Sequence, residues 1–146
     1  MHSHNYFLAR AESRMIEGDI AGAISDLTCG LELDPKNDTA RCNLAGLLAG
    51  IGKYEEAIVE YEKVDVGDIC KWVEVKYNEI QVLKSAGKRG ACLVLVSRWL
   101  SKVEQLLKDC LADDEGFLLL NEKERLNLDY LARRYGKVLD IQMGLS

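Results

Sequence analysis

The sequence predicts an all-α protein built as a solenoid of antiparallel helix pairs. Three observations support this: a single proline in 146 residues, apolar residues at helical spacing, and a glycine-centred pattern that recurs every 34 or 35 residues. So few prolines suit long uninterrupted helices better than a turn-rich β fold. A repeat of that length is typical of solenoids, in which each helical pair buries its apolar face against the next.

The repeat defines a helix–turn–helix unit. Its three copies share a turn glycine (Gly18, Gly52 and Gly87), a small residue five positions later (Ala23, Ala57 and Cys92), and a large residue four positions further on (Leu27, Tyr61 and Val96). The glycine ends the first helix and permits a left-handed turn. The small residue lets the second helix approach the first closely, and the large one fills the space between them.

Start and stop signals then place each helix in order. The predicted helices cover about residues 5–17, 20–33, 38–51, 54–65, 69–86, 88–111 and 121–142. Pro35 ends the second helix, and Asn37 or Asp38 can cap the third. Asn121 with Glu124 three residues later forms a capping box for the last helix.

The last predicted helix and the connector before it lie beyond the repeats. The helix carries one apolar stripe, formed by Leu128, Leu131, Tyr135, Val138 and Gln142 or Met143. We expect this stripe to cover the otherwise exposed face of the last repeat. The connector holds an apolar tetrad at 117–120, which either packs back on the long sixth helix or forms an exposed patch for a partner.

The repeat resembles that of the tetratricopeptide-repeat family over roughly residues 5–100. The second copy matches the family pattern best, through Leu44, Ala45, Leu48, Gly52, Tyr54, Ala57 and Tyr61. The resemblance implies a right-handed superhelical solenoid of about seven helices. It also implies a single domain over 1–146, with repeats at about 5–37, 38–70 and 71–104, and with the end of the long sixth helix and the capping helix in 105–146.

Three departures from the family pattern stand out. Glu79 occupies a position where a leucine is expected, and Cys92 replaces the usual alanine. Arg10 and Arg14 occupy positions that are usually apolar. We expect these two arginines to face water, because the outer face of a terminal repeat is solvated.

Members of the family bind peptides or helices of partner proteins in a concave groove lined by the first helix of each pair. Transferred to this sequence, the resemblance implies a groove formed by Leu8, Glu12, Met15, Thr39, Cys42, Asn43, Gly46, Ala49, Gly50, Glu74, Tyr77, Asn78, Gln81 and Lys84. Gly46 and Gly50 each cost a helix about 1 kcal/mol relative to alanine. They therefore indicate a close approach, by a partner, by a neighbouring helix or by the chain's own terminal helix.

One subset of the family holds the C-terminal carboxylate of heat-shock chaperones with lysine, arginine and asparagine donors. Only Asn43 matches that set. Glu12 and Glu74 stand where two of the donors belong, and their carboxylates would repel the tail. We therefore expect a different kind of peptide or helix as the partner.

Composition excludes several other functions. No apolar run approaches the roughly 20 residues of a membrane span, and no signal peptide is visible at the N-terminus. Five scattered cysteines indicate reduced thiols and a cytoplasmic protein. Residues 71–108 carry eight bases and three acids, but the whole chain has a net charge of −5 and no stacking motif. Nucleic acid is therefore not the expected ligand.

Nothing in the sequence predicts an enzyme. The two histidines, His2 and His4, are expected in a loose N-terminal tail, which leaves no histidine for a nucleophile pair in the core. No phosphate-binding or dinucleotide-binding glycine motif is present. The acids at 113–115 lack the spacing of a calcium loop. We expect no catalytic residue, no metal site and no cofactor.

The sequence thus predicts a protein–protein interaction module, such as an adaptor, a scaffold or a co-chaperone-like protein. The alternatives are a self-associating subunit, including a homodimer, and a fragment of a larger repeat protein that directs assembly. Glycines 46 and 50 facing an open groove would favour the module. An uncovered apolar stripe on the terminal helix would favour self-association.

Overall fold

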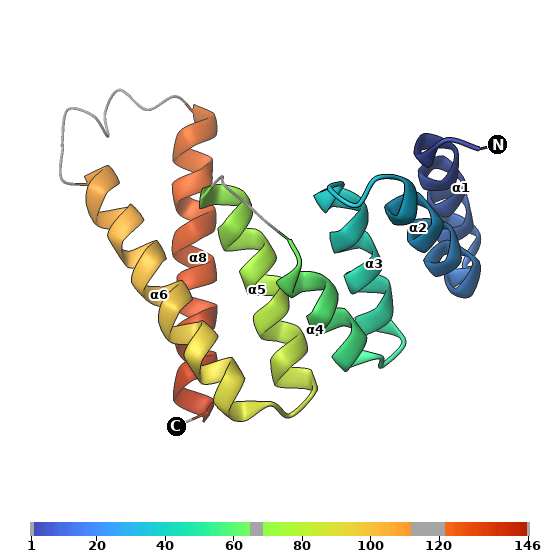
Figure 1. Cartoon of the computed structure of the whole chain (residues 1–146). Helices are drawn as coiled ribbons and strands as arrows, with labels where there is room; N and C mark the ends of the chain where they lie inside the picture. The colour runs from blue at the N-terminus through green and yellow to red at the C-terminus, as the bar shows by residue number, and fades with distance from the viewer. Residues whose placement is uncertain (1, 65–68, 112–121, 146) are drawn as a thin grey trace. The chain divides into compact units, whose positions relative to one another are not determined.

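The computed structural model describes residues 2–64, 69–111 and 122–145, with side chains given throughout except at 69–70, 109–111, 122–131 and 145. The described residues form helices and no strand (Figure 1). The helices are α1 (His4–Glu17), α2 (Ile20–Leu33), α3 (Asp38–Gly50), α4 (Tyr54–Glu62), α5 (Ile69–Ser85), α6 (Arg89–Leu111) and α8 (Glu122–Leu145). The predicted all-α class is confirmed, and each predicted helix end lies within about three residues of the observed one.

The predicted turn and cap residues do the expected work. Gly18, Gly52 and Gly87 have φ values of 83°, 83° and 72°, in the left-handed region that favours glycine. The Asn37 side chain accepts a hydrogen bond from the Ala40 backbone N–H at 3.0 Å, which caps α3. These local interactions fix where each helix ends and the next begins.

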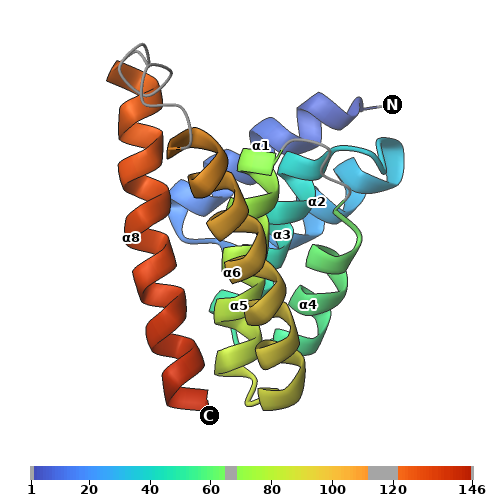
Figure 2. The same cartoon turned by 90° about the vertical axis from the view of Figure 1, so that its left-hand side faces the viewer.

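Two compact units make up the chain, residues 1–86 and residues 87–146. In the first unit each helix packs on the next, from α1 through to α5. In the second unit α6 lies beside α8, as both views show (Figures 1 and 2). The division falls between the two helices of the third predicted repeat, so the single-domain organisation stays a prediction.

The repeat positions account for the helix packing. The small residues Ala23, Ala57 and Cys92 are fully buried, and the large residues that follow them, Leu27, Tyr61 and Val96, are also buried. An alanine or cysteine at the crossing point lets two helix backbones approach, and the larger side chain one turn later fills the remaining space. The interpretation of these six positions as packing positions is confirmed.

The predicted stripe of the terminal helix is right at Val138 but omits Ile141. Val138 is fully buried and Tyr135 and Gln142 are half-buried, whereas Met143, the alternative to Gln142, is 68% exposed. Ile141, which the predicted stripe left out, is also buried. The side chains of Leu128 and Leu131 lie outside the described residues, as do Asn121, the acids at 113–115 and the apolar tetrad at 117–120. The inward stripe of α8 therefore runs through Val138 and Ile141.

The expectation that Arg10 and Arg14 face water is only partly right. Their side chains are 39% and 31% exposed, but both guanidinium groups also contact the carboxylate of Asp26 on α2, whose side chain is only 1% exposed. Similarly, Glu79 at the leucine position is buried, and Lys76 one turn earlier holds its carboxylate at 2.7 Å. At these positions, where the sequence departs from the family pattern, an ion pair offsets the free-energy cost of burying a charged side chain.

Candidate protein-binding surface

The first helices of the repeat units present one side chain face each within residues 1–86. On α1 this face carries Leu8, Glu12 and Met15, at spacings of four and three residues. On α3 it carries Thr39 and Asn43, and on α5 it carries Glu74 and Asn78. Residues three and four apart lie on one side of a helix, so each set forms a continuous stripe.

A small hollow lies where α1, α2 and α3 meet. It measures about 80 Å³, and the residues that line it are Leu8, Ala11, Glu12, Met15, Leu27, Asn37, Thr39, Ala40 and Asn43. Five of these were predicted groove residues: Leu8, Glu12, Met15, Thr39 and Asn43. The structure thus brings the predicted residues of α1 and α3 together around one depression.

A larger hollow lies between α3, Val64 just beyond the end of α4, and α5. It measures about 280 Å³, and its lining consists of Asp38, Thr39, Cys42, Asn43, Val64, Lys71, Glu74, Val75 and Asn78. Thr39 and Asn43 line both hollows. The two hollows therefore adjoin and form one surface, hereafter the groove surface, across α1, α3 and α5.

The larger hollow combines an apolar floor with charged edges. Val64 and Val75 are buried, whereas Lys71 is exposed. Burial, reinforced by the negative charge of Asp38, raises the pKa of the Cys42 thiol. That thiol therefore stays protonated at neutral pH and acts as a small, weakly polar side chain in the hollow.

Sequence reasoning missed Lys71, Asp38, Val64 and Val75 in this hollow. Lys71 could have been found, because it lies three residues before Glu74 on the same face of α5. Val64 could not, because it follows the end of α4 and no helical spacing connects it to the groove.

Six predicted groove residues line neither hollow. Gly46, Gly50 and Lys84 are exposed, Ala49 and Gln81 are half-buried, and Tyr77 is buried. Apart from its two chain neighbours and the nearby backbone of α3, a Cβ atom built at Gly46 or Gly50 would meet no described atom of the first unit within 4 Å. The interpretation that a neighbouring helix of this unit approaches these glycines closely is therefore wrong.

The N-terminal histidines do not lie in a loose tail. His4 is the first residue of α1, and its Nε2 lies 3.8 Å from a carboxylate oxygen of Asp34. The ring of His2 stacks on Tyr6 with a centroid separation of 3.8 Å. Within the described side chains, no three histidine, cysteine or acidic residues are grouped so that they could hold a metal ion.

Among the described helices, none is both long and apolar enough to cross a membrane.

No family model matches the sequence, and no curated protein matches it either. Its fold does have solved relatives. A crystal structure of MamA, a tetratricopeptide-repeat-like helical protein, superimposes with a TM-score of 0.60 at 15% identity, over 94% of this chain and 77% of MamA. A second MamA crystal structure gives a TM-score of 0.42 at 15% identity, over 94% of this chain and 90% of that one. The likeness to the first structure shows that this chain has an all-α, tetratricopeptide-repeat-like fold of stacked helix pairs.

Proposed function

We propose that the chain is a protein–protein interaction module that binds a peptide or helix of another protein on the groove surface. The observation that carries this proposal is the meeting of two hollows at Thr39 and Asn43. A surface continuous over three helices is long enough for several successive side chains of a partner segment. A repeat fold builds such extended surfaces from its stacked first helices.

The chemistry of the groove surface describes the partner segment. Its apolar parts, such as Leu8, Met15 and Val75, suit aliphatic side chains. Glu12 and Glu74 suit amide or cationic donors. The Lys71 ammonium can donate a hydrogen bond to one carboxylate or carbonyl oxygen near Glu74. A chaperone C-terminal carboxylate remains an unsuitable ligand, because both acids lie in the hollows where such a tail would bind.

The proposed role needs neither catalysis nor a cofactor. Among the described residues, Cys29 and Cys42 carry free thiols. Free thiols support the proposal of a cytoplasmic module, because reducing compartments keep cysteines unpaired. The proposed ligand is a protein, and nucleic acid is not part of the proposal.

A photo-crosslinking experiment tests the groove surface directly. Benzoylphenylalanine is placed at Asn43 in one variant, at Asn78 in a second, and at exposed Glu32 on α2 as a matched control. The proposal expects the same partner protein to be crosslinked from positions 43 and 78 but not from position 32. It also expects the adduct to disappear when Gly46→Leu and Gly50→Leu are added. These glycines line neither hollow, but they follow Asn43 by three and seven residues on the same exposed face of α3, so leucines there would obstruct a partner segment that continues along that face.

Circular dichroism of the double-leucine variant controls for folding, since no described atom of the first unit obstructs a Cβ at either glycine. Equal crosslinking from all three positions, or an adduct that survives the double substitution, would contradict the proposed site. An adduct of twice the chain's mass would instead identify a second copy as the occupant and would favour the self-associating subunit.

A further inference from the structure

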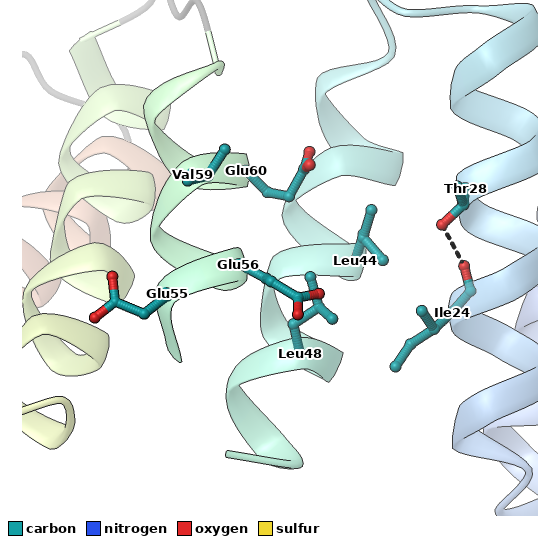
Figure 3. Close-up of a pocket in the computed structure, with 8 residues that line it drawn as sticks. All are labelled: Ile24, Thr28, Leu44, Leu48, Glu55, Glu56, Val59 and Glu60. Carbon is teal, nitrogen blue, oxygen red and sulfur yellow. Dashed lines mark hydrogen bonds between the residues drawn. The ribbon is translucent and has the colours of Figure 1, made fainter. Parts of the chain in front are cut away.

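A third hollow lies on the opposite side of α3 from the groove surface. It measures about 370 Å³ and is lined by Ile24, Thr28, Leu44, Leu48, Glu55, Glu56, Val59 and Glu60. Leu48 follows Thr39 by nine residues, which places the two side chains roughly 180° apart around the helix. The hollow therefore lies between α2 and α4, across α3, as Figure 3 shows.

The floor and walls of this hollow are aliphatic. Leu44 and Leu48 from α3 are each only 5% exposed and form the floor. Ile24 on α2 and Val59 on α4 form the two walls, and Val59 is 47% exposed. The Thr28 hydroxyl donates to the Ile24 carbonyl oxygen at 2.8 Å, so it requires no partner from a ligand. An apolar side chain seated here would remove exposed aliphatic surface from water.

The rim of the hollow is acidic. Its lining includes three glutamates and no basic residue. Arg41 and Lys63 bind Glu60, at 2.6 and 3.4 Å, so the charge of that carboxylate is largely offset. Glu56 is exposed, and Figure 3 shows its carboxylate extending over the leucine floor toward α2.

The shape selects the kind of occupant. Val59, Thr28 and Glu56 are exposed along the rim, so the hollow is open along its length. A small molecule would keep much of its surface in water here, whereas pockets for small ligands usually bury about 70–90% of them. A peptide segment can cover the opening while one of its side chains fills the hollow.

We propose that this hollow is a second docking site, which binds a basic amphipathic segment of a partner protein. The segment seats an aliphatic side chain on Leu44 and Leu48 and places a lysine or arginine against Glu56. Charge complementarity supports this choice, because residues 1–66 carry twelve acids and six bases. The site is independent of the groove surface, so both could be occupied at once.

The probe is a synthetic helical peptide of leucine and lysine. A peptide of leucine and glutamate is its control. Binding is measured by fluorescence anisotropy, and the site is mapped by methyl NMR shifts. The proposal expects the lysine peptide to bind and to shift the methyl signals of Ile24, Leu44, Leu48 and Val59. The methyl signals of Leu8 and Met15, on the groove surface, should stay unchanged.

Matched variants separate specific docking from general attraction to an acidic protein. Glu56→Lys is expected to weaken binding about fivefold or more, which is the upper range for an exposed ion pair. Glu12→Lys makes the same change of charge on the groove surface and is expected to leave the affinity within about twofold. Val59→Asn is expected to weaken binding several-fold without changing the helical circular dichroism.

Equal weakening by Glu56→Lys and Glu12→Lys would overturn the proposal, as would equal binding of the leucine–glutamate peptide. Methyl shifts confined to Leu8 and Met15 would also overturn it, and would place the peptide on the groove surface instead. If light scattering showed a dimer that Val59→Asn dissociates, a second copy of this chain would be the occupant and the proposal would be wrong. Failure of this test leaves the groove surface untouched, because Asn43 and Asn78 lie outside this hollow.

Discussion

Arg10 on α1 donates hydrogen bonds to the buried carboxylate of Asp26 on α2. Its Nε lies 3.1 and 3.0 Å from the two carboxylate oxygens, and its Nη2 lies 2.6 Å from Oδ1. Arg14 adds a contact from Nη1 to Oδ2 at 3.1 Å. The hydrogen bonds from Arg10 lower the pKa of Asp26 despite its burial, with a smaller contribution from the positive charge of Arg14, and the same Arg10–Asp26 hydrogen bonds raise the pKa of Arg10. The first helix pair is therefore held by charge-assisted contacts as well as by apolar packing.

Replacing Asp26 with asparagine is expected to lower the free energy of unfolding by about 1–3 kcal/mol at pH 7. The loss stays moderate because the Arg10 side chain is 39% exposed and its guanidinium can regain water. Urea denaturation measures the change. Glu32→Gln on the exposed side of the same helix is the control, expected within about 0.5 kcal/mol of the wild type. A loss no larger than that of the control would show that the pair contributes little.

The Asp26 carboxylate should also make the free energy of unfolding depend on pH in the acidic range. The pKa of Asp26 is lower in the folded chain than in the unfolded chain, where it is about 3.9. The contribution of Asp26 is therefore complete above that pH and is lost as the pH falls toward the folded value. Unfolding free energies measured between pH 7 and pH 3 should fall less steeply in Asp26→Asn than in the wild type. Parallel slopes would contradict the assignment.

Tyr61 on α4 should make the protein lose stability as the pH rises in the alkaline range. Burial, followed by the nearby charges of Cys42 and Glu79, raises the pKa of Tyr61 to about 12 from its usual 10.0. The unfolded chain loses this proton first, so the stability that the neutral phenol contributes is complete below pH 10 and is lost between pH 10 and 12. The difference in phenolate absorbance between the wild type and Tyr61→Phe should show one late-titrating tyrosine, which titrates near pH 10 in urea. A difference titrating near pH 10 without urea would contradict the prediction.

The sequence was sufficient for the fold because the repeat signals are local. A glycine that must take a positive φ and an alanine at a helix crossing are set by the immediate geometry of one turn, so Gly52 and Ala57 could be assigned without any tertiary information. The same holds for Asn37, whose cap involves a backbone N–H three residues away. Such signals recur in register, and each copy supports the interpretation of the others.

The candidate sites were harder to predict because they depend on which faces meet. Arg10 and Arg14 read as surface residues until Asp26, sixteen and twelve residues later, appears opposite them on α2. The acidic hollow on the far side of α3 likewise exists only because α2 and α4 are separated widely enough to leave a space above Leu44. Helical spacing assigns a residue to a face, but it does not show how widely two neighbouring helices are separated.

The exposed glycine in the middle of α3 offers a stabilising substitution. Gly46→Ala is expected to raise the free energy of unfolding by about 0.5–1 kcal/mol, because alanine restricts the unfolded chain and favours the helix. Apart from the two chain neighbours and the nearby backbone of α3, no described atom of the first unit would lie within 4 Å of the added Cβ. Urea denaturation tests this, with Gly18→Ala as the contrasting change. Gly18 has a φ of 83°, so alanine there should destabilise. Destabilisation by Gly46→Ala would mean that the glycine has an obstructed environment after all.

The small residues at the helix crossings should tolerate no enlargement. Ala57 is fully buried where α3 and α4 approach each other, so Ala57→Leu forces three extra carbon atoms into a filled interface. Overpacking of this kind costs about 1–3 kcal/mol, and we expect that loss in urea denaturation. Ala21→Leu on the exposed side of α2 introduces the same side chain without displacing a neighbour, and it should change stability by less than about 0.5 kcal/mol. Equal effects of the two substitutions would show that Ala57 does not set the distance between the helices. A loss confined to Ala57→Leu would show that the repeat alanine determines how closely α3 and α4 pack, and therefore the spacing of the hollows on either side of α3.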